Sequence, residues 1–161
     1  MKEQPFTHLD GAGKLRMVDV TRKRPTLRRA VASCVVYTVA DVLALGSSTN
    51  ELDPVHAARL AGIQAAKLTA NLIPLCHPLN LNEIQVEVIP KAGCIEISAS
   101  VAATHRTGVE MEALTACAFA ALGIVNSLVD TDPEARIDDL VLLRKSGGKS
   151  GDWGRLVDAP R

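Results

Sequence analysis

Apolar and polar residues follow one another along this chain in patterns that predict four strands. Val31–Thr38 is a continuous apolar and β-branched run, which is typical of a buried strand. Apolar residues alternate with polar ones in Ile84–Val88 and again in Ile95–Val101, and the turn-forming residues between these runs predict a β-hairpin. Ile137–Arg144 predicts the last strand.

Helix signals occupy the segments between these strands. We expect a short helix over Val39–Leu45. Asp53 is a good N-cap, and a proline follows it at the first helical position, so a longer helix is expected to begin there and to run to about Asn71. The segment from Gly108 to about Leu128 is apolar on almost every side, which predicts a helix buried in the core.

The order of these elements, β-α-α-β-β-α-β, predicts an α+β fold with helices on one face of an antiparallel or mixed sheet. A chain of 161 residues suits a single domain over 1–161, with an irregular lead-in at 1–18 and an irregular tail at 146–161. Because only 2% of the residues are aromatic, the core must be built from Ala, Val, Leu and Ile. Such a core often needs a second subunit to bury enough area.

Charge and targeting signals narrow the expected partners and location. Basic and acidic residues both number 18, so we expect neither a nucleic acid nor a membrane as partner. The first residues lack the apolar stretch of a signal peptide, and the longest apolar run, Ala113–Val125, is too short to cross a bilayer. Widely spaced cysteines predict reduced, buried thiols and a cytoplasmic protein. These cysteines are Cys34, Cys76, Cys94 and Cys117.

His77 is a candidate for chemistry because it lies between Pro74 and Pro78. Each proline fixes its own φ and restricts the residue before it, so the imidazole is held on a stiff turn. A rigid histidine suits binding or proton transfer, and a packing histidine on a structural turn fits the same pattern. Neighbouring Cys76 suggests a metal pair or a Cys/His nucleophile. The other histidines lack metal-ligand spacing, so no metal is expected.

Two further segments combine charge with glycine or with the start of a helix. Lys145 and Lys149 flank Ser-Gly-Gly, which suits a phosphate cradle and equally a flexible basic tail. Glu110 and Glu112 begin the apolar helix, where carboxylates favour the positive end of the helix dipole. Because residues two apart point to different sides of a helix, one of them can cap the helix while the other faces a site.

Three motifs stand out in order along the chain. They are Leu72-Ile-Pro-Leu-Cys-His-Pro-Leu79, Thr107-Gly-Val-Glu-Met-Glu-Ala-Leu-Thr-Ala116 and Lys145-Ser-Gly-Gly-Lys-Ser-Gly151. They resemble those of the molybdenum cofactor biosynthesis protein C family, the cyclic pyranopterin monophosphate synthases. The similarity runs from about residue 8 to Trp153, with support at Arg16–Val20 and Ala58–Lys67.

The resemblance implies a ferredoxin-like α+β subunit in a homo-hexamer, a trimer of dimers with sites at a subunit interface. It implies a substrate made from GTP, a 3′,8-cyclised dihydroguanosine triphosphate. The family rearranges this substrate to cyclic pyranopterin monophosphate and releases diphosphate, with no metal or other cofactor. It also implies a catalytic His77. The residues that match the family's substrate-binding positions are Leu75, Cys76, His77, Met111, Glu112, Lys67 and Lys145.

The chain departs from the family where catalytic groups are expected. The family helix carries an Asp-x-x-Lys pair, both taken as catalytic, and here Asn126 and Val129 occupy those positions. A third family lysine aligns with Glu51. Asn126 cannot exchange a proton near neutral pH, and Val129 supplies neither charge nor donor. The summed charge of the three positions changes from +1 to −1.

Two hypotheses about activity follow from these departures. In the first, the chain is a working lyase in which Arg106, Arg144 or Lys149 supplies the missing groups. In the second, it is a catalytically impaired paralogue, a pseudoenzyme that keeps the fold and either binds ligand or assembles with an active homologue. Losing one general acid–base group typically costs about 100- to 10,000-fold in rate, so the joint loss favours weak or absent activity for this chain alone.

Overall fold

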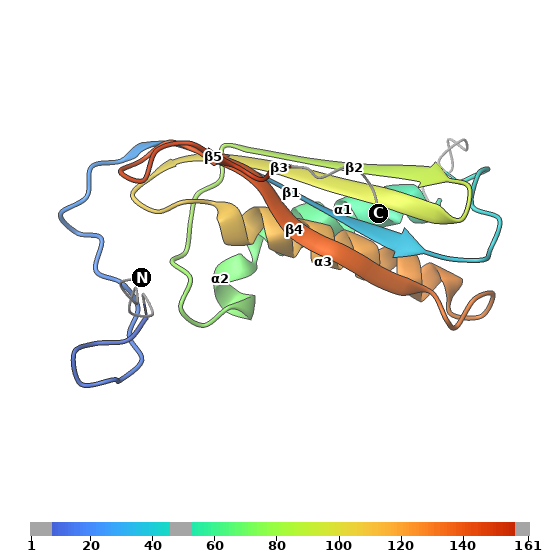
Figure 1. The fold of residues 1–161 in the computed structure, drawn as a ribbon, viewed down its shortest axis with the longest axis horizontal. Coiled ribbons are helices and arrows are strands. Elements are labelled where there is room, and N and C mark those ends of the chain that lie inside the picture. The colour runs from blue at the N-terminus through green and yellow to red at the C-terminus, as the bar shows by residue number, and fades with distance from the viewer. Residues whose placement is uncertain (1–7, 46–52, 157–161) are drawn as a thin grey trace.

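Two long helices cover one face of a five-stranded antiparallel sheet (Figure 1). The computed structural model describes residues 8–45 and 53–156. The elements are β1 (Thr26–Tyr37), α1 (Pro54–Lys67), α2 (Thr69–Leu72), β2 (Glu83–Lys91), β3 (Cys94–His105), α3 (Glu110–Leu128), β4 (Arg136–Ser146) and β5 (Trp153–Gly154). The sheet has the order β2-β3-β1-β4-β5, with α1 and α3 on the covered face, and the predicted α+β fold is confirmed.

The central strand β1 is longer than the sequence pattern predicts. It pairs with β3 in unbroken register from Thr26 opposite His105 to Tyr37 opposite Cys94. The first residues of β1, Thr-Leu-Arg-Arg, are mostly polar and lack a strand signal, and β3 supplies their hydrogen-bond partners. Because β1 pairs antiparallel with both neighbours, the start of β1 meets the ends of β3 and β4 at the same end of the sheet.

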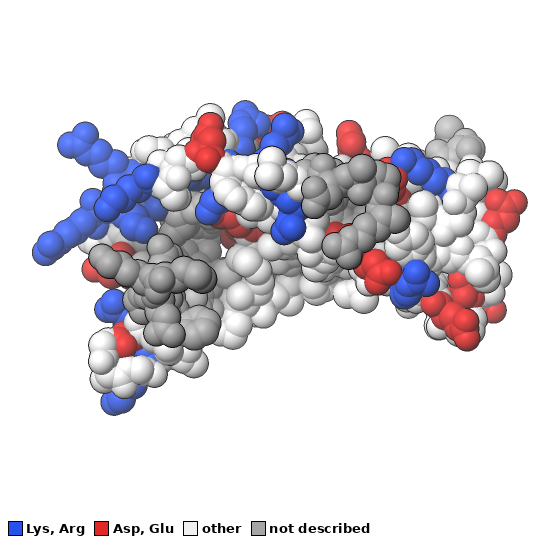
Figure 2. Space-filling view, in the orientation of Figure 1, with Lys and Arg blue, Asp and Glu red and all other residues white. Residues whose placement is uncertain are grey.

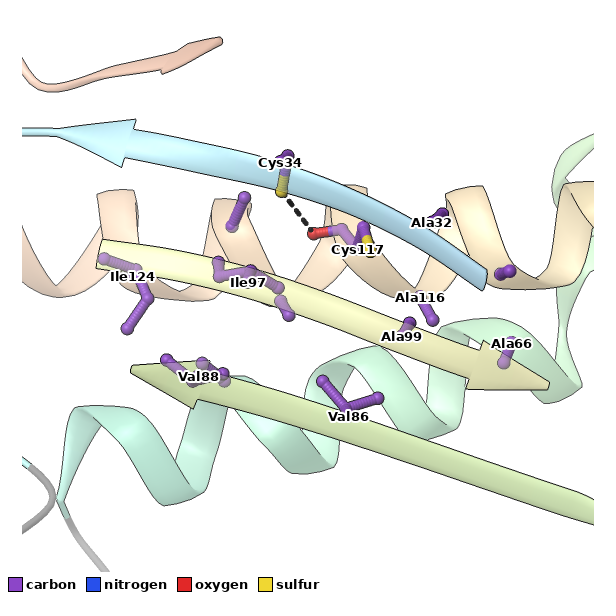
Figure 3. Packing of buried hydrophobic residues seen from close by; sticks show 14 of the residues in the cluster. Ala32, Cys34, Ala66, Val86, Val88, Ile97, Ala99, Ala116, Cys117 and Ile124 are labelled. Carbon is purple, nitrogen blue, oxygen red and sulfur yellow. Dashed lines mark hydrogen bonds between the residues drawn. The ribbon is translucent and has the colours of Figure 1, made fainter. Parts of the chain in front are cut away.

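The helices α1 and α3 pack closely because glycine stands where they approach. A Cβ at Gly62 on α1 would lie 2.8 Å from the backbone oxygen of Ala116 on α3. The core between helices and sheet consists of Ala, Val, Ile and Cys side chains and one leucine, Leu128, among the described residues, and it contains no aromatic side chain. Within it, the Cys34 thiol of β1 donates to the carbonyl oxygen of Cys117 on α3 at 3.6 Å (Figure 3).

The short helix predicted over Val39–Leu45 is wrong. This segment forms turns, because the carboxylate of Asp132 binds its start. The Thr38 hydroxyl donates to Asp132 Oδ2 at 2.6 Å, and the Val39 backbone N–H donates to the same oxygen at 2.8 Å. A carboxylate that is distant in sequence thus satisfies groups that a helix would otherwise need to satisfy.

The helix predicted from Asp53 to about Asn71 begins correctly but is interrupted. Asp53 caps α1 by accepting the Val55 backbone N–H at 2.8 Å. At Leu68 the backbone leaves helical geometry, with φ −101° and ψ 6°, and the chain resumes as α2. The Thr69 hydroxyl donates to the backbone oxygen of Ala66 at 3.0 Å, a local bond that competes with the helical ladder.

Three smaller expectations also change. The tail is not wholly irregular, because Trp153–Gly154 pairs with β4 as β5. Cys76 and Cys94 are partly exposed, and only the two cysteines on β1 and α3 are buried. The helix α3 is long and apolar enough to cross a bilayer by length and composition, which the run Ala113–Val125 alone did not predict. Half of its most apolar window is buried in this protein, as in a core helix.

Candidate functional site

A cavity of about 1620 Å³ opens at the end of the sheet where β1 begins and β4 ends. Four segments form most of its wall, namely the lead-in before β1, the His77 turn, the start of α3 and the glycine-rich loop after β4. The first residues of β1 complete the wall with Thr26 and Arg28. This volume exceeds the 300–1,000 Å³ that is usual for a small-molecule site. The predicted site residues that line it are Leu75, Cys76, His77, Met111, Glu112 and Lys145.

The His77 turn is held by its own backbone. The Cys76 N–H donates to the Ile73 oxygen at 3.0 Å, so the chain reverses between the two prolines and presents His77 to the cavity. Burial raises the pKa of the Cys76 thiol, and the negative charge of Glu112 raises it further. Cys76 therefore remains a protonated thiol near neutral pH and is unsuited to act as a nucleophile.

Glu110 and Glu112 have different environments, as their spacing on a helix predicts. Glu112 is 4% exposed. Burial raises its pKa to about 7, and the nearby Glu110 carboxylate adds to this effect. Glu110 instead forms an ion pair with Lys145, with 3.1 Å between Oε1 and Nζ. The cavity thus contains one carboxyl group that can gain or lose a proton near neutral pH and one that is neutralised by a lysine.

Among the residues that the structure describes, basic side chains outnumber carboxylates on the cavity wall by seven to two. Figure 2 shows Lys and Arg gathering over the end of the molecule where the lead-in and the glycine-rich loop lie. The zero net charge of the whole chain conceals this local excess of positive charge. The basic residues are Arg22, Lys23, Arg24, Arg28, Arg106, Lys145 and Lys149.

Several of these basic residues were not predicted as site residues from the sequence. The lead-in contributes Arg22, Lys23 and Arg24, whose run in the sequence was an available signal. Arg106 joins the lead-in to the body, because its Nε donates to the Lys23 backbone oxygen at 3.0 Å. Arg28 gave no local signal, since it reads as a polar residue before the predicted start of a strand.

Three predicted site residues lie outside this cavity. Lys67 is the last residue of α1, is exposed, and does not line the wall. Asn126 and Val129 are exposed at the far end of α3. Asn126 follows Glu112 by fourteen residues, which at the helical rise is about 21 Å along the axis. Glu51 lies outside the described residues.

Within the described ranges 8–45 and 53–156, no three His, Cys, Asp or Glu side chains lie close enough together to hold a metal ion. The arrangement instead offers a buried carboxyl group, an imidazole on a stiff turn and an excess of cations. Such a set can accept hydrogen bonds from N–H donors, pair with phosphate groups and move protons.

Fold and cavity together define an antiparallel α+β protein with a basic ligand pocket at one end of its sheet. The family model described as the MoaC family matches residues 17–148. That range includes all four segments of the pocket, apart from the first residues of the lead-in and the end of the glycine-rich loop. The chain therefore belongs to the MoaC family.

Relatives of similar length carry one activity in their names. A "Cyclic pyranopterin monophosphate synthase" from Geobacter metallireducens is 48% identical, with 93% of this chain and 96% of the relative covered. A protein of the same name from Streptomyces coelicolor is 46% identical and is covered to 89%. "Cyclic pyranopterin monophosphate synthase 2" from Mycobacterium bovis is 48% identical and is covered to 91%.

Proposed function

We propose that this chain serves molybdenum cofactor biosynthesis, at the conversion of a 3′,8-cyclised dihydroguanosine triphosphate to cyclic pyranopterin monophosphate with release of diphosphate. The observation that carries the proposal is the convergence of three sequence motifs on one basic cavity. His77, Glu112 and Lys145 come from segments far apart in the chain and line the same wall. Relatives named for this activity cover almost the whole chain.

The chemistry of such a substrate suits the pocket. A guanine-derived ring presents N–H donors, which the Glu112 carboxylate accepts once it is ionised. The triphosphate pairs with the excess of cations, and diphosphate leaves as an anion among them. His77 on its stiff turn is the proposed proton carrier. No step in this assignment needs a metal or cofactor, and a cytoplasmic location of the protein is part of the proposal.

A homo-hexamer built as a trimer of dimers is part of the proposal. Such an assembly needs two kinds of interface, and residues 8–45 and 53–156 leave two surfaces that no other described element covers. One is the outer stripe of α3, where Met111, Leu122 and Val129 are exposed at spacings that share a helix face. The other is the open face of the sheet. The far end of α3, about 21 Å from Glu112, reaches a pocket only as part of another subunit.

The second candidate function is a catalytically impaired paralogue that binds ligand and completes its sites with an active homologue. Asn126 and Val129 favour it, because both are exposed at the end of α3 and neither can carry a proton or a positive charge. In a mixed assembly, the intact pocket of this chain would receive a complete helix end from the homologue. A pocket of the homologue that received the helix end of this chain would lack the aspartate and the lysine and would be inactive.

Single-turnover conversion of the cyclised dihydroguanosine triphosphate separates the two candidates. Product and diphosphate from the purified chain support the synthase. If the chain alone gives no product, Asn126→Asp with Val129→Lys is expected to raise turnover by at least about 100-fold, the usual contribution of one acid–base group. Val129→Lys alone is the matched control, because it restores the charge without the acid.

Mixing experiments test the impaired paralogue directly. The chain is co-assembled with an active homologue whose own His77-equivalent pocket has been disabled. Activity that appears only in the mixture shows that the pocket of this chain works when another subunit supplies the helix end. If neither the double variant nor the mixture gives product, the assignment of the pocket is wrong.

A further inference from the structure

Arg28 on β1 bridges two parts of the cavity wall that are distant in the sequence. Its Nη1 donates to the Gly147 backbone oxygen at 3.4 Å, and its Nη2 donates to the Arg106 backbone oxygen at 3.3 Å. Gly147 belongs to the glycine-rich loop, whereas Arg106 precedes the start of α3. One guanidinium group therefore ties the loop that carries Lys149 to the segment that leads to Glu110 and Glu112.

The glycine-rich loop is shaped to admit this guanidinium group. A Cβ at Gly148 would lie 1.6 Å from Arg28 Nη1 and 2.3 Å from Cζ, so no other residue fits there unless the arginine moves. Gly147 and Gly148 also have φ values of 88° and 79°, a left-handed conformation that glycine adopts readily. The arginine and the two glycines thus fit one another in shape as well as by hydrogen bonds.

The third nitrogen of the Arg28 guanidinium group, Nε, shows what fixes the side chain. This Nε is the one buried side-chain nitrogen or oxygen within residues 8–45 and 53–156 that has no hydrogen-bond partner. Burying the Nε–H without a partner costs free energy, because this group loses its hydrogen bonds to water. Other contacts must therefore hold the side chain in its buried position. The two carbonyl groups and the glycine slot hold it there, and they orient the guanidinium fork toward the backbone.

We propose that Arg28 is a positioning residue for anion binding. It fixes the loop at residues 147–151 against the start of α3, and so places Lys149 on the cavity wall. Lysine is not an equivalent at this position, because a point charge cannot donate to two carbonyl groups in the geometry of a guanidinium fork. This inference rests on the proposed function in one respect, which is that the anion bound in the cavity is a polyphosphate.

Affinity for inorganic triphosphate, measured by titration calorimetry on the full chain, tests this role. Arg28→Lys and Arg28→Ala are both expected to bind about tenfold more weakly, because both lose the two-pronged contact that orders the loop. If Arg28 acted only through its positive charge, the Arg28→Lys variant would keep the affinity for triphosphate. Binding by Arg28→Lys at the strength of the unmodified chain would therefore overturn the proposal.

Gly148→Ala disturbs the contact between Arg28 and the glycine-rich loop from the side of the loop. It tests the proposal even if the arginine variants fold poorly. Gly151→Ala is its matched control, because Gly151 is also left-handed, with φ 69°, but has nothing within 4 Å of an added Cβ. We expect about a tenfold loss of affinity for Gly148→Ala and less than about twofold for Gly151→Ala. Equal losses would mean that backbone strain, and not displacement of Arg28, is the cause.

Hydrogen–deuterium exchange separates failure of this inference from failure of the proposed function. Without any ligand, the backbone amides of residues 147–151 are expected to exchange faster in Arg28→Lys than in the unmodified chain. Exchange in the β2–β3 hairpin should stay the same. Faster exchange in a protein that does not bind triphosphate would retain the positioning role and refute the polyphosphate ligand. Unchanged exchange in the loop would refute the positioning role itself.

Discussion

Replacing Glu112 with glutamine is expected to stabilise the protein, but only at neutral and alkaline pH. Burial raises the pKa of this carboxyl group from 4.5 to about 7. Between these two values the unfolded chain loses the proton while the folded chain keeps it. The free energy of unfolding therefore falls as the pH rises through this window, and the full cost is present above about pH 7.

The size of the effect follows from the difference between the two pKa values. At 1.36 kcal/mol for each unit, burying the ionised carboxylate costs about 3 kcal/mol. Glu112 lines an open cavity, and water screens part of this cost, so we expect on the order of 2 kcal/mol. Glu112→Gln keeps the shape of the protonated side chain and cannot ionise, so it removes the cost.

Urea denaturation at a series of pH values from 4.5 to 8.5 checks this expectation. The variant and the unmodified chain should be about equally stable at the acidic limit, and the variant more stable at the alkaline limit. Glu110→Gln is the control, because it breaks the partly exposed ion pair with Lys145 and should lower stability by at most about 1 kcal/mol. A Glu112→Gln chain with an unchanged pH profile would refute our account of this carboxyl group.

Four further changes test the packing and the charges. Gly62→Ala places a methyl group 2.8 Å from a backbone oxygen and should cost about 1–3 kcal/mol by overpacking, partly offset by better helix propensity, as measured by urea denaturation. Gly123→Ala, whose added Cβ meets nothing closer than 3.3 Å, should be the more stable of the two, and the reverse order would contradict the packing argument. Hydrogen bonds from Thr38 and Val39 lower the pKa of Asp132, so this carboxylate stabilises the fold above pH 3.8 and loses that effect as the pH falls. Asp132→Asn should therefore melt earlier than the unmodified chain at pH 7, with a gap that narrows in acid, and a constant gap would exclude this linkage. Lys145→Gln should weaken triphosphate binding by titration calorimetry and flatten its dependence on salt, and an unchanged affinity would remove Lys145 from the site.

The sequence by itself determined the elements whose signals are local. Alternating residues fixed the β-hairpin, and Asp53 with the proline after it fixed the start of α1, because a strand face and a helix cap depend on neighbours along the chain. The same holds for the pocket motifs, since His77, Glu112 and Lys145 lie in stretches that carry a recognisable pattern. Their meeting in one cavity follows from the antiparallel order of the sheet.

Only the tertiary structure decided features that depend on partners far away in the chain. Val39–Leu45 forms turns because the distant Asp132 binds its start. Arg28 becomes part of the cavity wall because β4 brings the glycine-rich loop beside it. The motif residues alone also do not show that Asn126 and Glu112 are far apart. The two residues lie toward opposite ends of the helix α3, which keeps them separated in space. Local patterns predict what each segment forms, whereas long-range contacts decide what each side chain can reach.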